Sequence, residues 1–199
     1  MRIQEIIEIY NDFSGTYDAD VKRKMRYTAY VTVPKLVLSH LNSTPARILD
    51  LGCGTGLSSL LFFKAGHQVT GIDGTHAMID RARKLPFKKL ISQNLEKPLR
   101  VKDVSFDAAV MVGVTEYIDD PAIVLEQVKR KLKPEGVFGL SFPRRSSWYT
   151  EYGLKSYYKK EVEPMMREAG FTIIECERGL GVAEYGRRVD YWIYVLKKT

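Results

Sequence analysis

The sequence predicts an α/β fold with a doubly wound, mostly parallel sheet of seven strands and a helical segment before it. Two observations predict this class. From residue 47 onward, short apolar runs typical of buried strands alternate with segments of helical periodicity. The last two apolar runs are joined by only about twelve residues, which suits a hairpin and not a crossover helix. One strand near the C-terminus is therefore expected to run antiparallel.

Each element follows from its own pattern. The strands are expected at residues 47–51, 68–72, 89–92, 106–112, 136–142, 171–177 and 190–196. The helices between them are expected at residues 57–65, 75–84, 121–132 and 159–169. Gly66 and Gly170 end two of these helices, and Pro121 begins another. Before the sheet, residues 3–12 read as a helix, and residues 18–42 as a helical stretch broken or kinked near Pro34.

The composition limits the classes of protein to which this chain can belong. Hydrophobic residues make up 45% and charged residues 28% of the 199-residue chain, which is ordinary globular usage. No apolar run approaches the ~20 residues that span a bilayer, and the N-terminus does not read as a signal peptide. Two cysteines form no disulfide framework, and no metal site is expected, so a reducing, cytoplasmic location is indicated. The net charge of +7 permits a nucleic-acid partner without requiring one.

The strongest motif joins the first strand to its helix. Gly52, Gly54 and Gly56 alternate in this turn, so a ligand can lie on the backbone and on the free N–H groups of the helix start. A dinucleotide-binding loop would place its third glycine where Leu57 stands. Asp50, two positions before the first glycine, suits a ligand that carries an ammonium and a sulfonium better than a pyrophosphate.

A second acidic residue ends the second strand. Asp73 lies 21 positions after Gly52, the place where a carboxylate binds a ribose diol in nucleotide-binding α/β folds. The alternative is an N-cap for the helix that follows. Gly74 would let an adenine approach, and Met78 either packs on that ring or belongs to the core.

The segment from Asp50 to Gly56, Asp-Leu-Gly-Cys-Gly-Thr-Gly, resembles motif I of the class I, Rossmann-like S-adenosylmethionine-dependent methyltransferases. Among these enzymes, the sequence most resembles the small-molecule methyltransferases of ubiquinone and menaquinone biosynthesis. The resemblance covers roughly residues 46–177. It implies S-adenosylmethionine as cofactor, S-adenosylhomocysteine as product, and Cys53 as part of the cofactor-binding loop.

The resemblance implies further cofactor contacts. Asn94, after the third strand, would bind the adenine amino group, although a loop asparagine is an equal alternative, and Leu95 would cover the ring. Gly113 and Val114 follow the fourth strand, at the carboxyl edge of the sheet where ligands bind. Tyr17, in a Tyr-Asp pair, would touch the methionine end of the cofactor.

The resemblance also gives the domain organisation. Residues 1–199 are expected to form one methyltransferase domain, with residues 1–42 as a helical cap over the cofactor site and residues 43–199 as the core. Arg26 is either a partner of the cofactor carboxylate or a surface residue, and the second interpretation is favoured.

No catalytic residue is assigned. The family often shows Gly-Val-Leu-Glu-His-Ile after the fourth strand, whereas this chain has Tyr117 in place of the histidine. Glu116 is either catalytic or a helix-capping carboxylate, and the second interpretation is favoured.

The acceptor pocket is expected between the cap, residues 113–120 and residues 143–154. The aromatic and arginine residues of this last stretch suit a flat or anionic acceptor, or else a lid that packs on itself.

We therefore expect in-line methyl transfer to a small-molecule acceptor. An RNA or protein methyltransferase is an alternative, weakened by the mild charge and the lack of a recognition module. A non-catalytic S-adenosylmethionine-binding protein is another. A nicotinamide oxidoreductase is opposed by Leu57 and Asp50.

Overall fold

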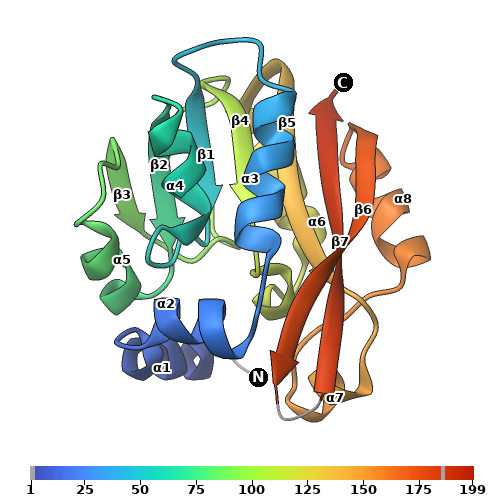
Figure 1. The fold of residues 1–199 in the computed structure, drawn as a ribbon. Coiled ribbons are helices and arrows are strands. Elements are labelled where there is room, and N and C mark those ends of the chain that lie inside the picture. The colour runs from blue at the N-terminus through green and yellow to red at the C-terminus, as the bar shows by residue number, and fades with distance from the viewer. Residues whose placement is uncertain (1–2, 185–186) are drawn as a thin grey trace.

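A computed structural model describes residues 3–184 and 187–199, and shows a seven-stranded sheet with helices on both faces (Figure 1). The strand order is β3-β2-β1-β4-β5-β7-β6. Strand β7 runs antiparallel to both of its neighbours, and the other neighbouring pairs are parallel. The predicted fold class, with one antiparallel strand near the C-terminus, is therefore confirmed.

All seven predicted strands are present. They are β1 (Arg47–Leu51), β2 (Gln68–Asp73), β3 (Lys89–Ser92), β4 (Phe106–Met111), β5 (Leu132–Pro143), β6 (Phe171–Glu184) and β7 (Arg187–Lys198). The helices are α1 (Ile3–Phe13), α2 (Tyr17–Ala19), α3 (Ala29–Ser39), α4 (Leu60–Lys64), α5 (His76–Ala82), α6 (Pro121–Lys131), α7 (Ser147–Glu151) and α8 (Lys159–Glu168). A π-helical turn, η1 (Asp20–Lys24), and two 3-10 turns, η2 (Leu57–Ser59) and η3 (Thr115–Tyr117), complete them.

The sheet creates a ligand site where its strand order reverses. Strand β1 pairs with β2 on one side and with β4 on the other, both in parallel register. The connections after β1 and β4 therefore leave in opposite directions, and the crevice between them lies at the carboxyl ends of the strands. This is the position where open α/β sheets bind ligands.

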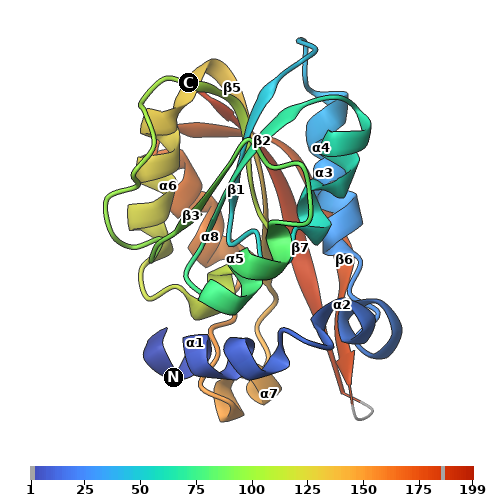
Figure 2. The ribbon, with the colours of Figure 1, turned by 90° about the vertical axis from the view of Figure 1, so that its left-hand side faces the viewer.

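The two faces of the sheet are covered by different helices. Helices α3 and α4 lie on one face, and α6 and α8 lie on the other (Figure 2). Val33 and Val37 of α3 are completely buried with Phe62 of α4, whereas Val128 of α6 and Met166 of α8 are buried in the core of the opposite face. Apolar side chains on both faces explain why the strands read as nearly continuous hydrophobic runs.

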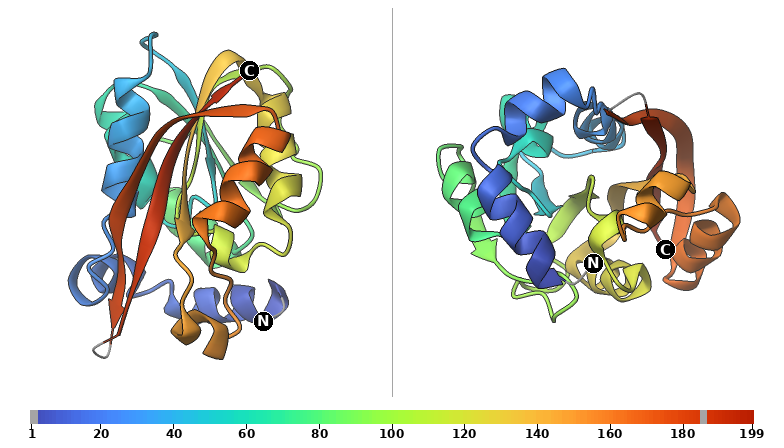
Figure 3. Two further views of the ribbon diagram at one scale, coloured as in Figure 1. Left: turned by 90° about the vertical axis from the view of Figure 1, so that its right-hand side faces the viewer. Right: turned by 90° about the horizontal axis from the view of Figure 1, so that it is seen from below.

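The N-terminal region divides into two parts. Elements α1, α2 and η1 lie beyond the carboxyl ends of the parallel strands, at the same end of the molecule as α7 (Figures 1 and 3), whereas α3 packs on the face of the sheet. The expected break near Pro34 was wrong. Pro34 lies buried inside α3, and the chain leaves the helical conformation earlier, at Arg26 with its φ of 50°. A proline removes only one helical hydrogen bond, and here burial of α3 against the sheet outweighs that loss.

The last two strands are longer than predicted. The sequence indicated a connection over residues 178–189, because glycines punctuate it, but β6 continues to Glu184 and β7 begins at Arg187. Gly181 has no room for a side chain, since an added Cβ would overlap the backbone of Val189 on the partner strand. These glycines permit close strand pairing at a register shift. The extended hairpin reaches the cap, where the Ala183 N–H donates to the carbonyl of Met25 at 3.0 Å.

Two short elements were not predicted, η3 after β4 and α7 within residues 143–154. Both stand at the carboxyl edge of the sheet (Figure 3) and both contribute to the site below. Within the described ranges, none of the helices combines the length and the hydrophobicity that a membrane crossing needs.

Candidate functional site

Three cavities adjoin at the carboxyl edge of the sheet. The first, which we call the glycine cleft, has a volume of about 110 Å³ and is bounded by Gly52, Gly54 and Asp73. The second, the aromatic chamber, has a volume of about 330 Å³ and lies between the cap, α7 and β7. The third is a small recess of about 20 Å³ beside Cys53. Tyr17 of α2 lines all three cavities.

The turn after β1 exposes its backbone because its glycines adopt conformations that other residues avoid. Gly52, Gly54 and Gly56 have φ values of 69°, 52° and 99°. At Gly54, an added Cβ would meet nothing closer than the Tyr17 ring at 4.0 Å, so the cleft side of this residue is open. At Gly56, an added Cβ would lie 2.5 Å from Leu85, so this glycine permits close packing instead.

Asp73 stands at the end of β2, between the glycine turn and α5. Its carboxylate accepts hydrogen bonds from the N–H groups of Gly54 and Thr75, both at 2.8 Å. Burial raises the pKa of this carboxyl above its usual range, although the backbone donors act in the opposite direction. Asp73 thus ties the turn to the start of α5 and also lines the glycine cleft, so the predicted ligand contact and the alternative of a structural role are compatible.

The rest of the glycine cleft has an apolar wall. Met78 of α5 and Leu95 after β3 are buried beside it, and Val114 after β4 closes it. Gly74 leaves open space, since an added Cβ would meet nothing closer than the Gln93 carbonyl oxygen and the Ile7 side chain, both at 4.0 Å. Asn94 lines the cleft, and its Oδ1 accepts from the Glu96 N–H at 2.8 Å, as a loop asparagine does.

This set of groups fits an adenosyl ligand. Adenine needs a slot between apolar side chains, and a ribose diol needs a carboxylate fixed at the end of the second strand. The cleft provides both, and the open sides of Gly54 and Gly74 leave the room that side chains would fill. The recess beside Cys53 extends the same space along the glycine turn.

Two sequence-predicted residues do not line the three cavities. Gly56 packs against Leu85, as described above. Asp50 is completely buried, and its Oδ2 accepts from the hydroxyls of Ser58 at 2.7 Å and Ser59 at 2.6 Å. Burial raises the pKa of Asp50 to about 6. Asp50 therefore links β1 to η2 through its Oδ2, while its Oδ1 is buried without a hydrogen-bond partner in the described residues. Its contact with a ligand stays a prediction.

Sequence reasoning missed several residues of the glycine cleft. They are Ile7 and Tyr10 of α1, Thr75, Val112, Tyr117 and Ile118. The apolar face of the first helix was visible in the sequence, but periodicity does not say which surface such a face covers.

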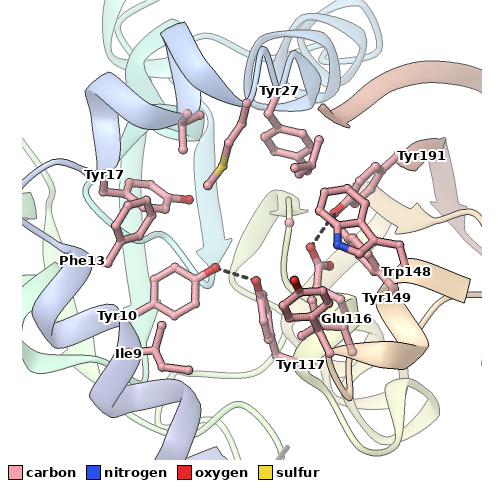
Figure 4. Close-up of a pocket in the computed structure, with 16 residues that line it drawn as sticks. Ile9, Tyr10, Phe13, Tyr17, Tyr27, Glu116, Tyr117, Trp148, Tyr149 and Tyr191 are labelled. Carbon is pink, nitrogen blue, oxygen red and sulfur yellow. Dashed lines mark hydrogen bonds between the residues drawn. The ribbon is translucent and has the colours of Figure 1, made fainter. Parts of the chain in front are cut away.

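The aromatic chamber is walled by rings from segments far apart in the chain (Figure 4). Rings of the cap come from Tyr10, Phe13, Tyr17 and Tyr27, and the opposite wall comes from Tyr117, Trp148, Tyr149, Tyr152 and Tyr191. Most phenol hydroxyls of this wall already bond each other or a neighbour. Tyr10 and Tyr117 pair at 2.6 Å, and the Tyr27 hydroxyl lies 3.2 Å from the Ser141 Oγ.

Glu116 carries the carboxylate of the aromatic chamber. It is only 4% exposed, and its Oε1 accepts from the Tyr191 hydroxyl at 2.6 Å. The Tyr191 oxygen lies 2.7 Å from the Tyr149 oxygen, which completes a chain of three groups. The Glu116 Oε2 is buried and has no hydrogen-bond partner within the described part of the chain. Burial raises the pKa of Glu116 to about 7, although the Tyr191 hydrogen bond lowers it.

The favoured interpretation of Glu116 as a helix cap was therefore wrong. The helix that follows is capped by Asp120, whose Oδ1 accepts from the Ala122 N–H at 3.0 Å. Glu116 instead lies inside the chamber because η3 turns it toward β7. Its partner Tyr191 is 75 residues away in the sequence, and no local pattern reveals that contact.

The expected arginines lie outside the chamber. Arg144 stacks over the Trp192 ring with its Cζ 4.6 Å from the centroid, and Arg145 pairs with Glu161 at 3.0 Å. Arg26 is exposed at its turn, as the favoured interpretation had it. None of the described residues that line the chamber is Lys, Arg or His, and this does not suit the expectation of an anionic acceptor.

Comparison with known proteins gives consistent results. The family model described as a methyltransferase domain matches residues 49–140. The chain is 30% identical over 135 residues to a ubiquinone biosynthesis O-methyltransferase of Xanthomonas oryzae pv. oryzae, covering 65% of this chain and 56% of that protein. It is 28% identical over 161 residues to the tRNA 5-carboxymethoxyuridine methyltransferase of Escherichia coli, covering 77% of this chain and 59% of that protein. The chain thus spans little more than half the length of these curated relatives.

Solved structures share the fold. An S-adenosylmethionine-dependent methyltransferase of Thermotoga maritima, described as a possible histamine N-methyltransferase, superposes with a TM-score of 0.72 at 24% identity, over 96% of this chain and 99% of that one. The Burkholderia thailandensis 1,6-didemethyltoxoflavin-N1-methyltransferase gives a TM-score of 0.72 at 20% identity, over 100% of this chain and 91% of that one. The family match over residues 49–140, the shared fold and the glycine cleft together support a class I S-adenosylmethionine-dependent methyltransferase with S-adenosylmethionine as its cofactor.

Proposed function

We propose that this protein transfers a methyl group from S-adenosylmethionine to a small molecule bound in the aromatic chamber. The observation that carries this proposal is the shared wall between the chamber and the glycine cleft. Tyr10, Tyr17, Gly113 and Tyr117 line both. A cofactor held in the cleft therefore has an acceptor site beside it, with room for a compact ligand.

Each part of the cofactor would contact residues of the glycine cleft with matching chemistry. Asp73 would accept from the ribose hydroxyls, Met78 and Leu95 would enclose the adenine, and the backbone after Gly54 would face the amino acid end. When bound, S-adenosylmethionine supplies an activated methyl group on a sulfonium.

The main work of the protein would be alignment and the exclusion of water. Holding two reactants in line can contribute ~7–11 kcal/mol to lowering a barrier. Tyr17 lines both ligand cavities and the small recess, and burial holds the pKa of its phenol above the usual range. It would therefore stay neutral and serve as a wall that positions both ligands.

A tRNA substrate is the second candidate, because the tRNA methyltransferase relative aligns with more of this chain than the ubiquinone relative does. Nucleic acid binding depends on Lys and Arg contacts to phosphates. The chamber wall lacks such side chains in the described residues, and the nearby Arg144 and Arg145 have partners. This arrangement supports a small acceptor.

The proposal is tested first at the cofactor. We expect S-adenosylmethionine and S-adenosylhomocysteine to bind in calorimetric titration and NAD not to bind. In the Asp73→Ala variant the affinity should fall about tenfold or more, because a hydrogen-bonding carboxylate is lost. Asp80→Ala, on the exposed side of α5, is the matched control and should bind like the unaltered protein. Absence of adenosyl binding by the folded protein, or selective NAD binding, would contradict the proposal.

A further inference from the structure

Resting on the proposed function, we propose that the acceptor is a flat, uncharged or cationic molecule whose methylated nitrogen or oxygen carries a hydrogen, and that Glu116 Oε2 receives this hydrogen. Four features of the chamber carry this inference: its ring-lined shape, its charge, the unsatisfied oxygen, and the tyrosines that face Glu116.

The shape of the chamber selects a flat ligand. Its walls are aromatic rings that stand roughly perpendicular to one another, for example Tyr10 against Tyr117 at 87° and Trp148 against Tyr152 at 88°. Such rings offer both faces and edges, and aromatic pairs prefer offset or edge-to-face contact with another ring. A planar acceptor finds these contacts on several sides (Figure 4).

The charge of the chamber excludes an anion. Among the described residues that line the chamber, Glu116 is the only one with a carboxyl or basic side chain. A carboxylate or phosphate on the acceptor would then be buried beside a like charge with no cation to pair with, which is strongly unfavourable. An uncharged or cationic acceptor meets no such penalty.

The unsatisfied oxygen locates the contact. Buried carboxylate oxygens nearly always have hydrogen-bond partners, and Glu116 Oε2 has none in the described structure. Oε1 is already engaged by Tyr191, so an incoming donor has one vacant acceptor to meet. An N–H or O–H group on the ligand would satisfy it and would place the atom that bears the hydrogen beside the shared wall of the glycine cleft.

Of Glu116 and the titratable groups that face it, Glu116 is the one that changes its charge near neutral pH. The facing titratable groups from the packed elements are all phenols. They are Tyr10, Tyr17, Tyr27, Tyr117, Tyr149, Tyr157 and Tyr191. Burial raises the pKa of every one of them, so they stay neutral over the pH range in which Glu116, with a pKa of about 7, changes charge.

Glu116 can therefore accept the proton that the proposed reaction releases. The acceptor heteroatom uses its lone pair to form the bond to the methyl carbon, the bond from carbon to sulfur breaks, and its electron pair remains on sulfur. The hydrogen of the acceptor leaves as a proton and ends on Glu116 Oε2, which turns the carboxylate into a carboxylic acid. Tyr191 is a positioning residue, since its hydrogen bond to Oε1 orients the carboxyl and lowers its pKa.

Binding of three matched probes tests the inference without turnover. The protein is saturated with S-adenosylhomocysteine and titrated with 2-naphthol, which is flat and carries a hydroxyl. The comparisons are 2-methoxynaphthalene, which lacks the hydrogen, and 2-naphthoate, which is an anion. We expect 2-naphthol to bind about tenfold or more tightly than either, with an affinity that rises from about pH 5.5 to about pH 8.5 as Glu116 ionises.

Variants assign the effect to Glu116. In Glu116→Gln the affinity for 2-naphthol should fall about tenfold above neutral pH, and its pH dependence should vanish. In Tyr191→Phe the midpoint of the pH dependence should move to higher pH, a change that a merely structural role would not produce. Glu126→Gln, exposed on α6, is the control and should leave probe binding unchanged. Retained S-adenosylhomocysteine binding shows that each variant is folded.

The outcomes separate the two proposals. If S-adenosylhomocysteine does not bind the unaltered protein, the proposed function fails. If it binds but none of the three probes does, or 2-naphthoate or 2-methoxynaphthalene binds as well as 2-naphthol, the inference on the acceptor is overturned. The same holds if Glu116→Gln binds 2-naphthol with unchanged affinity and pH dependence.

Discussion

At the scale of single residues, the chemistry of the site depends on a carboxyl whose surroundings favour the proton. Glu116 is buried among phenols, and one tyrosine hydrogen bond only partly offsets the loss of hydration. Asp50 is buried in a similar way, and its Oδ1, like the Glu116 Oε2, has no hydrogen-bond partner in the described residues. Two serine hydroxyls donate to its Oδ2, however, and it lines none of the three cavities. A buried carboxyl group thus stabilises the fold in one place and faces the aromatic chamber in another.

The raised pKa of Glu116 predicts how stability depends on pH. The folded protein holds this proton up to about pH 7, whereas the unfolded chain releases it near the usual value of 4.5. The folded state therefore loses stability as the pH rises between these values, by about 3 kcal/mol for this one group. Glu116→Gln keeps an acceptor for Tyr191 and carries no charge, so it should avoid this loss.

The measurement is denaturant unfolding of both proteins at a series of pH values. The difference in the free energy of unfolding should shift in favour of Glu116→Gln from about pH 4.5 to about pH 7. Asp50, whose pKa of about 6 is raised by burial, is present in both proteins, so its effect cancels. A difference that stays constant across this range would show that Glu116 is not protonated in the folded state.

The residues that sequence reasoning could place are those whose partners are near in the chain. The glycine turn and Asp73 lie on consecutive elements, and Gly54 and Asp73 do meet. The hydrogen bonds of Glu116 could not be predicted because Tyr191 and Tyr149 come from other, distant elements. The hydrogen bonds of Asp50 to Ser58 and Ser59 were not predicted, because the sequence does not tell in which direction a buried strand residue points.

At the scale of elements, the helical cap is held over the site by a few polar contacts. The Thr55 hydroxyl, in the glycine turn, donates to Asp18 of α2 at 2.5 Å. Arg81 of α5 donates to the carbonyl of Gly15 at 3.2 Å, and the Ala77 N–H donates to Asn11 at 3.3 Å. The cap thus contacts the same turn that lines the glycine cleft. The position of the cap and the shape of the cleft therefore depend on each other.

Removing the first of these contacts should loosen the cap. In Asp18→Ala we expect faster hydrogen exchange and faster proteolysis within residues 3–24, because one side-chain hydrogen bond contributes about 1 kcal/mol. Affinity for S-adenosylhomocysteine should fall about fivefold. Asp12→Ala, an exposed position of α1, is the control. Unchanged exchange in the cap together with unchanged affinity would mean that this contact does not hold the cap over the cleft.

The elements that the sequence predicted less well are those shaped by contacts outside themselves. The break in the N-terminal helices falls at Arg26, where the chain passes from the cap to the sheet, and Pro34 is carried inside a buried helix. The glycines of β6 suggest a loop locally, yet they serve close pairing with β7. Where periodicity and packing agree, as in β1 and α6, the prediction and the structure coincide closely.

At the scale of the whole molecule, the topology places two ligand spaces side by side. The reversal of strand order beside β1 creates the glycine cleft, and the cap, α7 and the extended β6–β7 hairpin add the aromatic chamber next to it. The fold class and the cleft could be predicted because both follow from alternating elements and one motif. The chamber lies where the acceptor pocket was expected, between the cap, residues 113–120 and residues 143–154. The contribution of Val182 and Tyr191 could not be predicted, since only the tertiary structure brings β6 and β7 to this place.

The central claim is that a cofactor in the glycine cleft presents its reactive end to the aromatic chamber. A crystal structure of the protein with S-adenosylhomocysteine tests this most directly. We predict the ribose at Asp73, the adenine between Met78 and Leu95, and the sulfur beside Tyr17, facing the chamber that holds Glu116. A ligand bound elsewhere, or a sulfur directed away from the chamber, would contradict the account.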